Sequence, residues 1–347
     1  MKFSTRRLSA VAAIAVTATL SLTACGSSNN ASGSGGASRG GGSGTTVTFI
    51  PKNLGNPYFD ASDKDGGKKA VAEFKGTYQE VGPDTATPDG QVSFINTATQ
   101  QGIKALVVSA DDPKAPCDAL KQAMSAGTKV VTFDSDTDPS CRDIFVNQAS
   151  AEGIAEAQAD IMAKEIGGAG QVAILSAAAN ATNQNTWNSL MKAYIAKKYP
   201  KIQVVDTVYG NDDDQTSFDK TAALLQDHPQ LKGIISPTTV GIAAAARYLD
   251  SSKSKGKVML TGLGDPAQMK KYVEDGTVPQ FALWNPTDLG YLAAYAAKAL
   301  VDGTITGKQG DTFTAGTLGK YTVGADGVVV LGKPFVFNKS NIGQFNF

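Results

Sequence analysis

The segment Asp134-Ser135-Asp136-Thr137-Asp138 carries three carboxylates at alternate positions, a pattern that could bind a cation or supply an acid and a base. It begins like a calcium-binding loop, but Pro139 and Phe145 stand where such a loop needs glycine and glutamate. An EF-hand is therefore excluded, and the segment is interpreted as a strand that ends in a carboxylate. A secreted hydrolase that uses Asp134 and Asp136 stays open as an alternative.

The other motifs that could do chemistry have simpler interpretations. The chain has a single histidine, His228, which excludes an HExxH zinc site and any multi-histidine metal site. Gly262 to Ala267 fits a dinucleotide fingerprint formally, but Pro266 is unsuited to the phosphate-binding turn, so we interpret the stretch as a glycine turn. No Walker A sequence exists, and Asp212-Asp213-Asp214 is interpreted as the cap of the next helix. We expect no cofactor, no metal ion and no catalysis.

Groups suited to a hydroxyl-rich ligand occur at the junction of a strand and a helix and near the ends of expected strands. Asn53 to Phe59 combines amides with two aromatic rings, held by a glycine and a proline at the junction of a strand and a helix. The only two tryptophans, Trp187 and Trp284, fall near expected strand ends. Amides can bond to hydroxyls and flat rings can cover apolar C–H faces. The same aromatic residues could also be ordinary core fillers.

From Thr46 onward, short β-branched runs alternate with segments of helical periodicity. Near-continuous apolar strands are typical of parallel sheets that helices cover on both faces. The repeated βα units predict an α/β fold with two doubly wound parallel-sheet domains, joined by several crossings. The expected strands are Val47–Pro51, Tyr78–Val81, Ala105–Ser109, Val130–Phe133, Ile144–Val146, Val172–Ser176, Val204–Tyr209, Gly233–Ser236, Val258–Thr261 and Phe281–Trp284. The expected helices are Asp60–Phe74, Gly90–Gln101, Ala115–Ala126, Ala151–Ile166, Gln184–Tyr199, Gln215–Gln226, Val240–Leu249, Ala267–Glu274 and Asp288–Val301.

Domain boundaries follow from where the pattern restarts. The restart near Asn147 indicates the first crossing, and the extended tail after Gly310 should return to an existing domain. We therefore expect a first lobe of residues 45–147 plus 286–318 and a second lobe of residues 148–285 plus 319–347. Ligands of doubly wound sheets bind at the carboxyl ends of the strands, and the residues that follow the expected strands are polar here.

The amino-terminal region has the build of a leader. Residues 1–25 run from a basic patch through a short apolar stretch to Leu22-Thr23-Ala24-Cys25, which resembles a bacterial lipobox and predicts a lipidated Cys25. An ordinary secretory signal is the alternative. Residues 26–44 are rich in glycine and serine and are expected to form a flexible tether. The other cysteines, Cys117 and Cys141, could then form a disulfide outside the membrane or remain two buried thiols.

The charge of the folded part is mildly acidic. The first 44 residues hold four basic and no acidic side chains, which leaves 28 basic against 32 acidic residues in the rest of the chain. This balance excludes a basic nucleic-acid-binding surface of the usual kind.

Several segments together resemble the ABC-transporter solute-binding lipoproteins of the ribose-binding, type I periplasmic-binding class. The resemblance covers essentially the whole mature domain, and the nearest groups in the class bind rhamnose or autoinducer-2. The carrying segments are Phe49–Lys52, Gly55–Phe59, Asp89–Val92, Ser109–Pro113, Thr132–Asp136, Thr182–Trp187, Ser236–Gly241, Leu283–Pro286 and Asn338–Gly343.

The resemblance implies a ligand site shared by both lobes. From the first lobe it takes Lys52, Asn56, Tyr58, Phe59, Ser109 and Asp134. From the second lobe it takes Asn183, Gln184, Pro237 and Thr239, with Trp284 over an apolar face of the ligand and Asn285 at a hinge crossing.

Two positions separate the possible ligands. The autoinducer-2 pattern has an aspartate where Asn183 stands and an alanine where Thr239 stands, whereas the rhamnose pattern has the residues found here. The cysteine pair Cys117 and Cys141 is typical of the autoinducer-2 group. We therefore favour rhamnose or a close deoxyhexose, with autoinducer-2 or another sugar as alternatives.

The function implied is that of a monomeric, lipid-anchored receptor on the extracytoplasmic face of the cell membrane. It would close over one monosaccharide and pass it to the membrane subunits of an ABC permease, without chemistry on the ligand. A sensor that presents its ligand to a membrane kinase has the same fold and remains an alternative.

Overall fold

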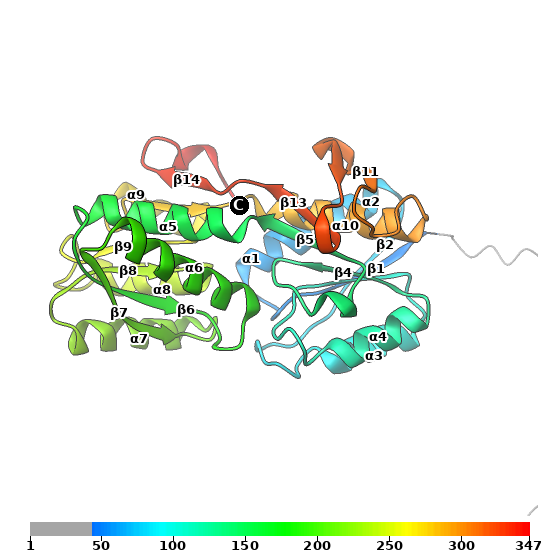
Figure 1. Ribbon diagram of the computed structural model, residues 1–347, viewed down its shortest axis with the longest axis horizontal. Coiled ribbons are helices and arrows are strands. Elements are labelled where there is room, and N and C mark those ends of the chain that lie inside the picture. Colours follow the sequence, from blue (N-terminus) through cyan, green and yellow to red (C-terminus); the bar gives the residue numbers. More distant parts are fainter. Residues whose placement is uncertain (1–43) are drawn as a thin grey trace, which may run out of the picture. The chain divides into compact units, whose positions relative to one another are not determined.

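The computed structural model describes residues 44–347, and two parallel β-sheets dominate this part of the chain (Figure 1). The expected leader, Cys25 and all but the last residue of the tether lie outside the described residues. The ten strands expected from the β-branched runs are confirmed, and none of their ends shifts by more than three residues. The α/β fold class is therefore confirmed.

The first sheet has six parallel strands in the order β13-β5-β4-β3-β1-β2. Alternate side chains of its strands face opposite layers, so Val107 packs with Phe49 and Phe133, whereas Leu106 packs with Ile50. All five side chains are fully buried, as expected for a sheet covered on both faces. The strands are β1 (Thr46–Ile50), β2 (Thr77–Glu80), β3 (Ala105–Val108), β4 (Lys129–Phe133), β5 (Ile144–Ala149) and β13 (Val328–Gly332).

Helices cover both faces of this sheet. On one face lie α3 (Val92–Gln100) and α4 (Cys117–Ser125), and the other face carries α10 (Pro286–Val301) with the segment from Pro57 to Glu73. The sequence predicts one helix over Asp60–Phe74, but the structure has three consecutive pieces there: α1 (Pro57–Phe59), the π-helix η1 (Asp60–Gly67) and α2 (Lys68–Glu73).

Packing explains why η1 lies so close to α10. A Cβ atom on Gly66 would lie 2.0 Å from the carbonyl oxygen of Thr287, and one on Gly290 would lie 1.8 Å from that of Ser62. Only glycine permits these two backbones to approach so closely. This contact fixes the start of α10 against the segment that carries Tyr58 and Phe59.

The second sheet has four parallel strands in the order β7-β6-β8-β9. A bridge between Leu263 and Ala282 joins it to the antiparallel pair β10–β14. The four strands of the sheet are β6 (Gly170–Ser176), β7 (Ile202–Tyr209), β8 (Leu231–Ser236) and β9 (Met259–Gly262), and the pair consists of β10 (Gln280–Leu283) and β14 (Phe335–Asn338). The helices of this half are α5 (Ala151–Glu165), α6 (Thr182–Lys198), α7 (Asp214–Asp227), α8 (Thr239–Asp250) and α9 (Pro266–Glu274).

The chain passes between the sheets after β5, after β10 and after β13. The last crossing corrects one expected boundary, because residues 319–347 do not all join the second lobe. Strand β13 pairs in parallel with β5 of the first sheet, and only β14 returns to β10. The tail, which the sequence predicts to be extended after Gly310, also contains a hairpin of β11 (Thr312–Thr314) and β12 (Lys320–Thr322).

Cys117 and Cys141 form a disulfide with a Cα–Cα distance of 5.2 Å. It links the start of α4 to the 3₁₀ helix η2 (Pro139–Cys141), which follows the carboxylate-bearing end of β4. The cross-link closes a loop of 24 residues within the first lobe. Such a loop contributes about 3 kcal/mol to stability in the chain-entropy description.

Candidate ligand-binding site

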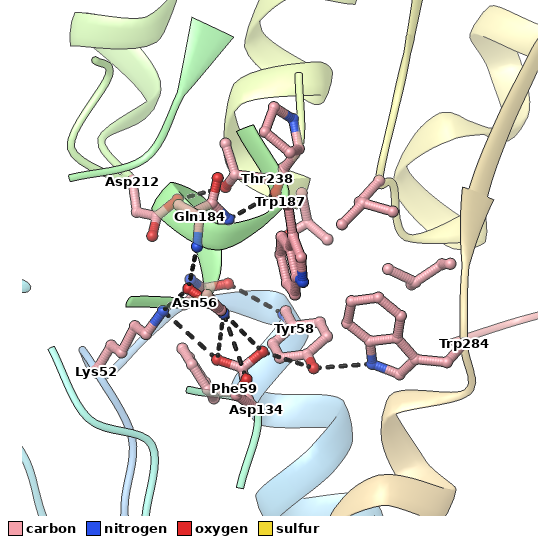
Figure 2. A pocket seen from close by; sticks show the side chains of 15 residues that line it. Lys52, Asn56, Tyr58, Phe59, Asp134, Gln184, Trp187, Asp212, Thr238 and Trp284 are labelled. Atoms are coloured by element: carbon pink, nitrogen blue, oxygen red, sulfur yellow. Dashed lines mark hydrogen bonds and ion pairs between the residues drawn. The ribbon is translucent and has the colours of Figure 1, made fainter. Parts of the chain in front are cut away.

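A pocket lies where the carboxyl ends of strands from both sheets meet, the position expected for ligands of doubly wound folds (Figure 2). Its walls leave about 370 Å³ free of protein atoms. The lining residues are Lys52, Asn56, Tyr58, Phe59, Asp134, Asn183, Gln184, Trp187, Asp212, Pro237, Thr238, Thr239, Leu263, Leu283 and Trp284.

Asp134 is the centre of the first-lobe wall. It follows β4 directly and has a left-handed backbone with φ of +59°, which turns its carboxylate into the pocket instead of along the strand. The hydroxyl groups of Ser109 and Tyr58 donate to its two oxygens at 2.8 and 3.2 Å. The Gln148 amide donates to the Asp134 carbonyl at 3.2 Å. The first-lobe carboxylate is thus oriented by buried partners before any ligand arrives.

Lys52 supplies the positive charge that this buried carboxylate requires. Its ammonium nitrogen lies 3.5 Å from Asp134 Oδ2, and only 5% and 7% of the two side chains are exposed. A buried ion pair costs desolvation energy and is kept where its groups serve a purpose beyond stability. Because both groups line the pocket, they are available to hydroxyl groups of a bound molecule.

Three aromatic side chains continue the wall from Asp134 toward β10. The Trp284 indole N–H donates to the Tyr58 hydroxyl at 2.9 Å, and that hydroxyl donates in turn to Asp134. Burial, reinforced by the Asp134 charge, raises the pKa of Tyr58 well above its ordinary value, so the phenol keeps its proton. Trp187 from α6 lies 5.9 Å from Trp284 between ring centres.

Local interactions fix the conformation of the loop between β1 and α1. Asn56 caps α1, because its side-chain oxygen accepts from the Tyr58 amide at 3.1 Å, and Pro57 occupies the first helical position. The amide and the aromatic ring are therefore placed by one short capped turn.

The second-lobe wall is built from the first turn of α6. Gln184 is fixed from both sides, since its amide donates to the Pro237 carbonyl at 2.6 Å and its oxygen accepts from Ser176 at 3.2 Å. Asn183 accepts from the Lys52 ammonium at 3.2 Å and donates toward the Asp134 carboxylate at 3.4 and 3.5 Å. These bonds join the two lobes directly across the pocket.

Ten of the twelve expected ligand-binding residues line the pocket: Lys52, Asn56, Tyr58, Phe59, Asp134, Asn183, Gln184, Pro237, Thr239 and Trp284. The other two lie behind its surface. Ser109 supports Asp134, and Asn285 uses its side chain to cap α10 by accepting from the Thr287 and Asp288 amides.

Sequence reasoning left out other lining residues. Trp187 was considered only as a candidate aromatic, and Thr238, Leu263 and Leu283 carried no motif. Asp212 was interpreted as part of a helix cap, yet the cap of α7 is its neighbour Asp213. Its signal was the position just after a strand of a doubly wound sheet, which applies to Asp212 as it does to Asp134.

A second hollow adjoins the pocket on the side of Asn56 and Asp212, which line both spaces. It lies between the 53–57 and 84–86 segments of the first lobe and the 211–214 turn of the second, and it is partly open to solvent.

The geometry argues against an acid–base pair of Asp134 and Asp136. Arg142 holds Asp136 through two bonds of 2.6 and 2.7 Å, and Asp136 does not line the pocket. No group of three or more metal-binding side chains occurs within residues 44–347. In the same residues, none of the helices has both the length and the apolar character needed to cross a membrane.

Comparison with known proteins gives the relationship of this chain. The model of the periplasmic binding protein domain matches residues 47–305. A crystal structure of a sugar ABC transporter protein from Actinomyces odontolyticus is 51% identical, with a TM-score of 0.71, and covers 87% of this chain and 98% of that one.

Two further solved structures are similar over 87% of this chain. An ABC transporter solute-binding protein from Clostridium phytofermentas with bound L-rhamnose is 40% identical over 98% of its length, with a TM-score of 0.84. LsrB from Clostridium saccharobutylicum, in complex with AI-2, is 30% identical over its whole length, with a TM-score of 0.81.

Proposed function

The chain belongs to the periplasmic binding protein family, and from this premise we propose that it binds L-rhamnose or a closely related 6-deoxyhexose between its two lobes. It is a sugar-binding protein of an ABC transporter and not an enzyme. In the proposed cycle, the lobes close over one sugar, and the closed form delivers it to the membrane subunits of the importer. The ligand can favour closure only by its differential contacts with the closed form.

The observation that carries the choice of ligand is the division of the pocket into a polar and an apolar side. Lys52 and Asp134 lie at one side, and Trp187 and Trp284 lie at the other (Figure 2). Asn183 belongs to the polar side, because it bonds to both Lys52 and Asp134. A 6-deoxyhexose has the same division, because hydroxyl groups surround most of its ring and a methyl group stands where a hexose carries its C6 hydroxymethyl group. Leucines and aromatic rings receive such a methyl group well, while they would leave a hydroxyl without a partner. The apolar residues of the lining are Phe59, Trp187, Pro237, Leu263, Leu283 and Trp284.

Two neutral side chains of the second-lobe wall support the same ligand. Asn183 and Thr239 match the rhamnose-binding pattern, and an amide can both donate to and accept from ring hydroxyls. The structure with bound L-rhamnose is also more similar to this chain than the AI-2 complex is, at 40% against 30% identity.

Autoinducer-2 is the second candidate, and a specific observation favours it. The Cys117–Cys141 disulfide matches a cysteine pair typical of autoinducer-2-binding proteins. Asp212 also places a carboxylate on the second-lobe side of the pocket, although it comes from a different segment than residue 183.

We further propose that lipidated Cys25 anchors the protein to the extracytoplasmic face of the membrane and that residues 26–44 act as its tether. We also expect a monomer. A Cys25→Ser variant should then be released from the cell, and fractionation of membranes and medium would measure this. Retention of the variant in the membrane would contradict the anchor.

Calorimetric titration of residues 43–347, which form one compact unit, tests the ligand proposal. The panel is L-rhamnose, L-fucose, D-ribose, D-galactose and autoinducer-2. We expect tight one-to-one binding of L-rhamnose and a melting temperature that rises with its concentration. Binding of autoinducer-2 alone would show that autoinducer-2, and not L-rhamnose, is the ligand. Binding of none of the compounds would contradict the proposed function.

A further inference from the structure

Asp212 lies in an unusual turn between β7 and α7. Asn211 and Asp212 both have left-handed backbones, with φ of +57° and +52°. The turn is held by bonds from the Gly210 and Asn211 amides to carbonyl groups at the end of β6, at 2.8 and 3.2 Å. Consecutive non-glycine residues in this conformation are uncommon and occur where surrounding structure imposes them, often at ligand sites.

The three consecutive aspartates of this turn have different roles. Asp213 caps α7 by accepting from the Thr216 amide at 2.7 Å, and Asp214 forms an exposed ion pair with Arg247. Asp212 does neither, and it is the one of the three that lines the pocket. Helix capping and surface charge therefore account for its neighbours but not for Asp212.

The contacts of Asp212 leave one carboxylate oxygen for a ligand. Oδ1 accepts a hydrogen bond from the Thr238 hydroxyl, and no bond within residues 44–347 involves Oδ2. Figure 2 shows the carboxylate at the edge of the pocket on the side of Lys52, with one oxygen bonded to Thr238. Burial raises the pKa of Asp212, and the Lys52 charge opposes that increase, so the two groups interact across the lobes.

We infer that Asp212 is a ligand-binding, specificity-determining residue of the second lobe, whose free oxygen accepts one hydroxyl group of the bound sugar. This inference rests on the proposed function. Thr238 acts as its positioning residue, because it occupies one oxygen and directs the other into the pocket.

The arrangement places a carboxylate on each wall and the Lys52 ammonium between them. Asp134 is held by hydroxyl groups of the first lobe, whereas Asp212 lies on the second lobe with only one of its oxygens bonded. A sugar hydroxyl that donates to Asp212 therefore favours the form in which both lobes contact the ligand. A sugar that lacks this hydroxyl would leave the half-buried carboxylate without that partner, which lowers its affinity.

The test compares full-length wild-type protein with Asp212→Asn by calorimetry against L-rhamnose and its 2-, 3- and 4-deoxy derivatives. Asparagine tolerates a left-handed backbone and keeps an oxygen for Thr238, so the turn should persist. Asp213→Asn is the matched control, because asparagine caps helices as well as aspartate does.

We expect Asp212→Asn to bind L-rhamnose at least tenfold more weakly and Asp213→Asn to bind within twofold of wild type. One deoxy derivative should bind wild type and Asp212→Asn equally, because it lacks the hydroxyl that Asp212 accepts. An unchanged affinity of Asp212→Asn would overturn the inference, as would equal losses for the sugar and all three derivatives. If the wild-type protein does not bind L-rhamnose but binds another sugar of the panel, the same comparison is made with that sugar and its deoxy derivatives. If the wild-type protein binds none of the sugars, both the proposed function and this inference are overturned.

Discussion

The two walls of the pocket solve the problem of binding a polyol in different ways. The first-lobe wall carries a complete ion pair, Lys52 and Asp134, that Ser109 and Tyr58 orient from behind. The second-lobe wall offers mainly neutral amides at the start of α6, and Gln184 is held there by Ser176 and the Pro237 carbonyl.

The difference follows from what each wall must do during closure. Charged groups are the most costly to remove from water, and that cost is lowest where partners already surround them. Amides lose less on desolvation, so a wall that moves onto the ligand can carry them cheaply. Under the proposed function, we therefore expect the first lobe to capture the sugar and the second lobe to select which complexes close.

The largest expected effect on sugar affinity comes from Asp134→Asn, which changes the central residue of the first-lobe wall. Asparagine tolerates the left-handed backbone, so the change removes the charge and leaves Lys52 buried without its counterion. We expect affinity for L-rhamnose to fall by about 100-fold or more. The free energy of unfolding should decrease by about 3 kcal/mol. Calorimetry and urea titration measure the two effects.

The control for this variant is Asp138→Asn, in the same turn. Asp138 is exposed and caps η2 by accepting from the Ser140 amide, a role that asparagine fills. It should leave affinity and stability near the wild-type values. Similar losses in both variants would show that the turn as a whole, and not the Asp134 charge, supports binding.

The fold was predictable because its local and tertiary preferences agree. The β-branched runs produced all ten expected strands, and parallel sheets covered by helices need such apolar runs. The π-helix η1 was not predictable, because it packs closely against α10, which lies more than 200 residues away in sequence. Gly66 of η1 and Gly290 of α10 permit this close approach. The pairing of β13 with β5 was missed for the same reason: a short extended run does not indicate which sheet edge it joins.

Most of the site was predictable from positions after strands and from family resemblance, and the exceptions depend on side-chain direction. Asn285 was expected in the pocket, but its side chain bonds to the first amides of α10. Asp212 was expected in a cap, but the left-handed backbone turns it into the pocket and leaves capping to Asp213. Neither direction can be read from residue type alone.

Substitution of the two tryptophans should have an intermediate effect on sugar affinity, and the two losses should differ. Trp284 donates to the Tyr58 hydroxyl and so supports Asp134, whereas no hydrogen bond within residues 44–347 involves the Trp187 indole nitrogen. Trp284→Phe should therefore lower sugar affinity about tenfold, the value of one buried hydrogen bond. Trp187→Phe should change it less than threefold. Calorimetry measures both, and equal losses would indicate that the rings act only by their apolar area.

The smallest expected effect is at Asp111, where the rim of the first wall meets the second lobe. The Asp111 carbonyl accepts from Asn180 at 3.0 Å, and its buried Oδ2 has no partner among the described residues. Burial raises the pKa of Asp111 to about 8, with Asp212 and Asp112 adding to the increase and Lys52 opposing it.

The folded protein therefore holds a proton on Asp111 that the unfolded chain has lost, so this group makes the free energy of unfolding fall as pH rises from about 4 to about 8. Asp111→Asn imitates the protonated form, so it should be more stable than wild type at pH 8 but equally stable at pH 4. Urea titrations at both pH values measure this difference, and a variant that is less stable than wild type at pH 8 would show that the ionised carboxylate is favourable at this edge.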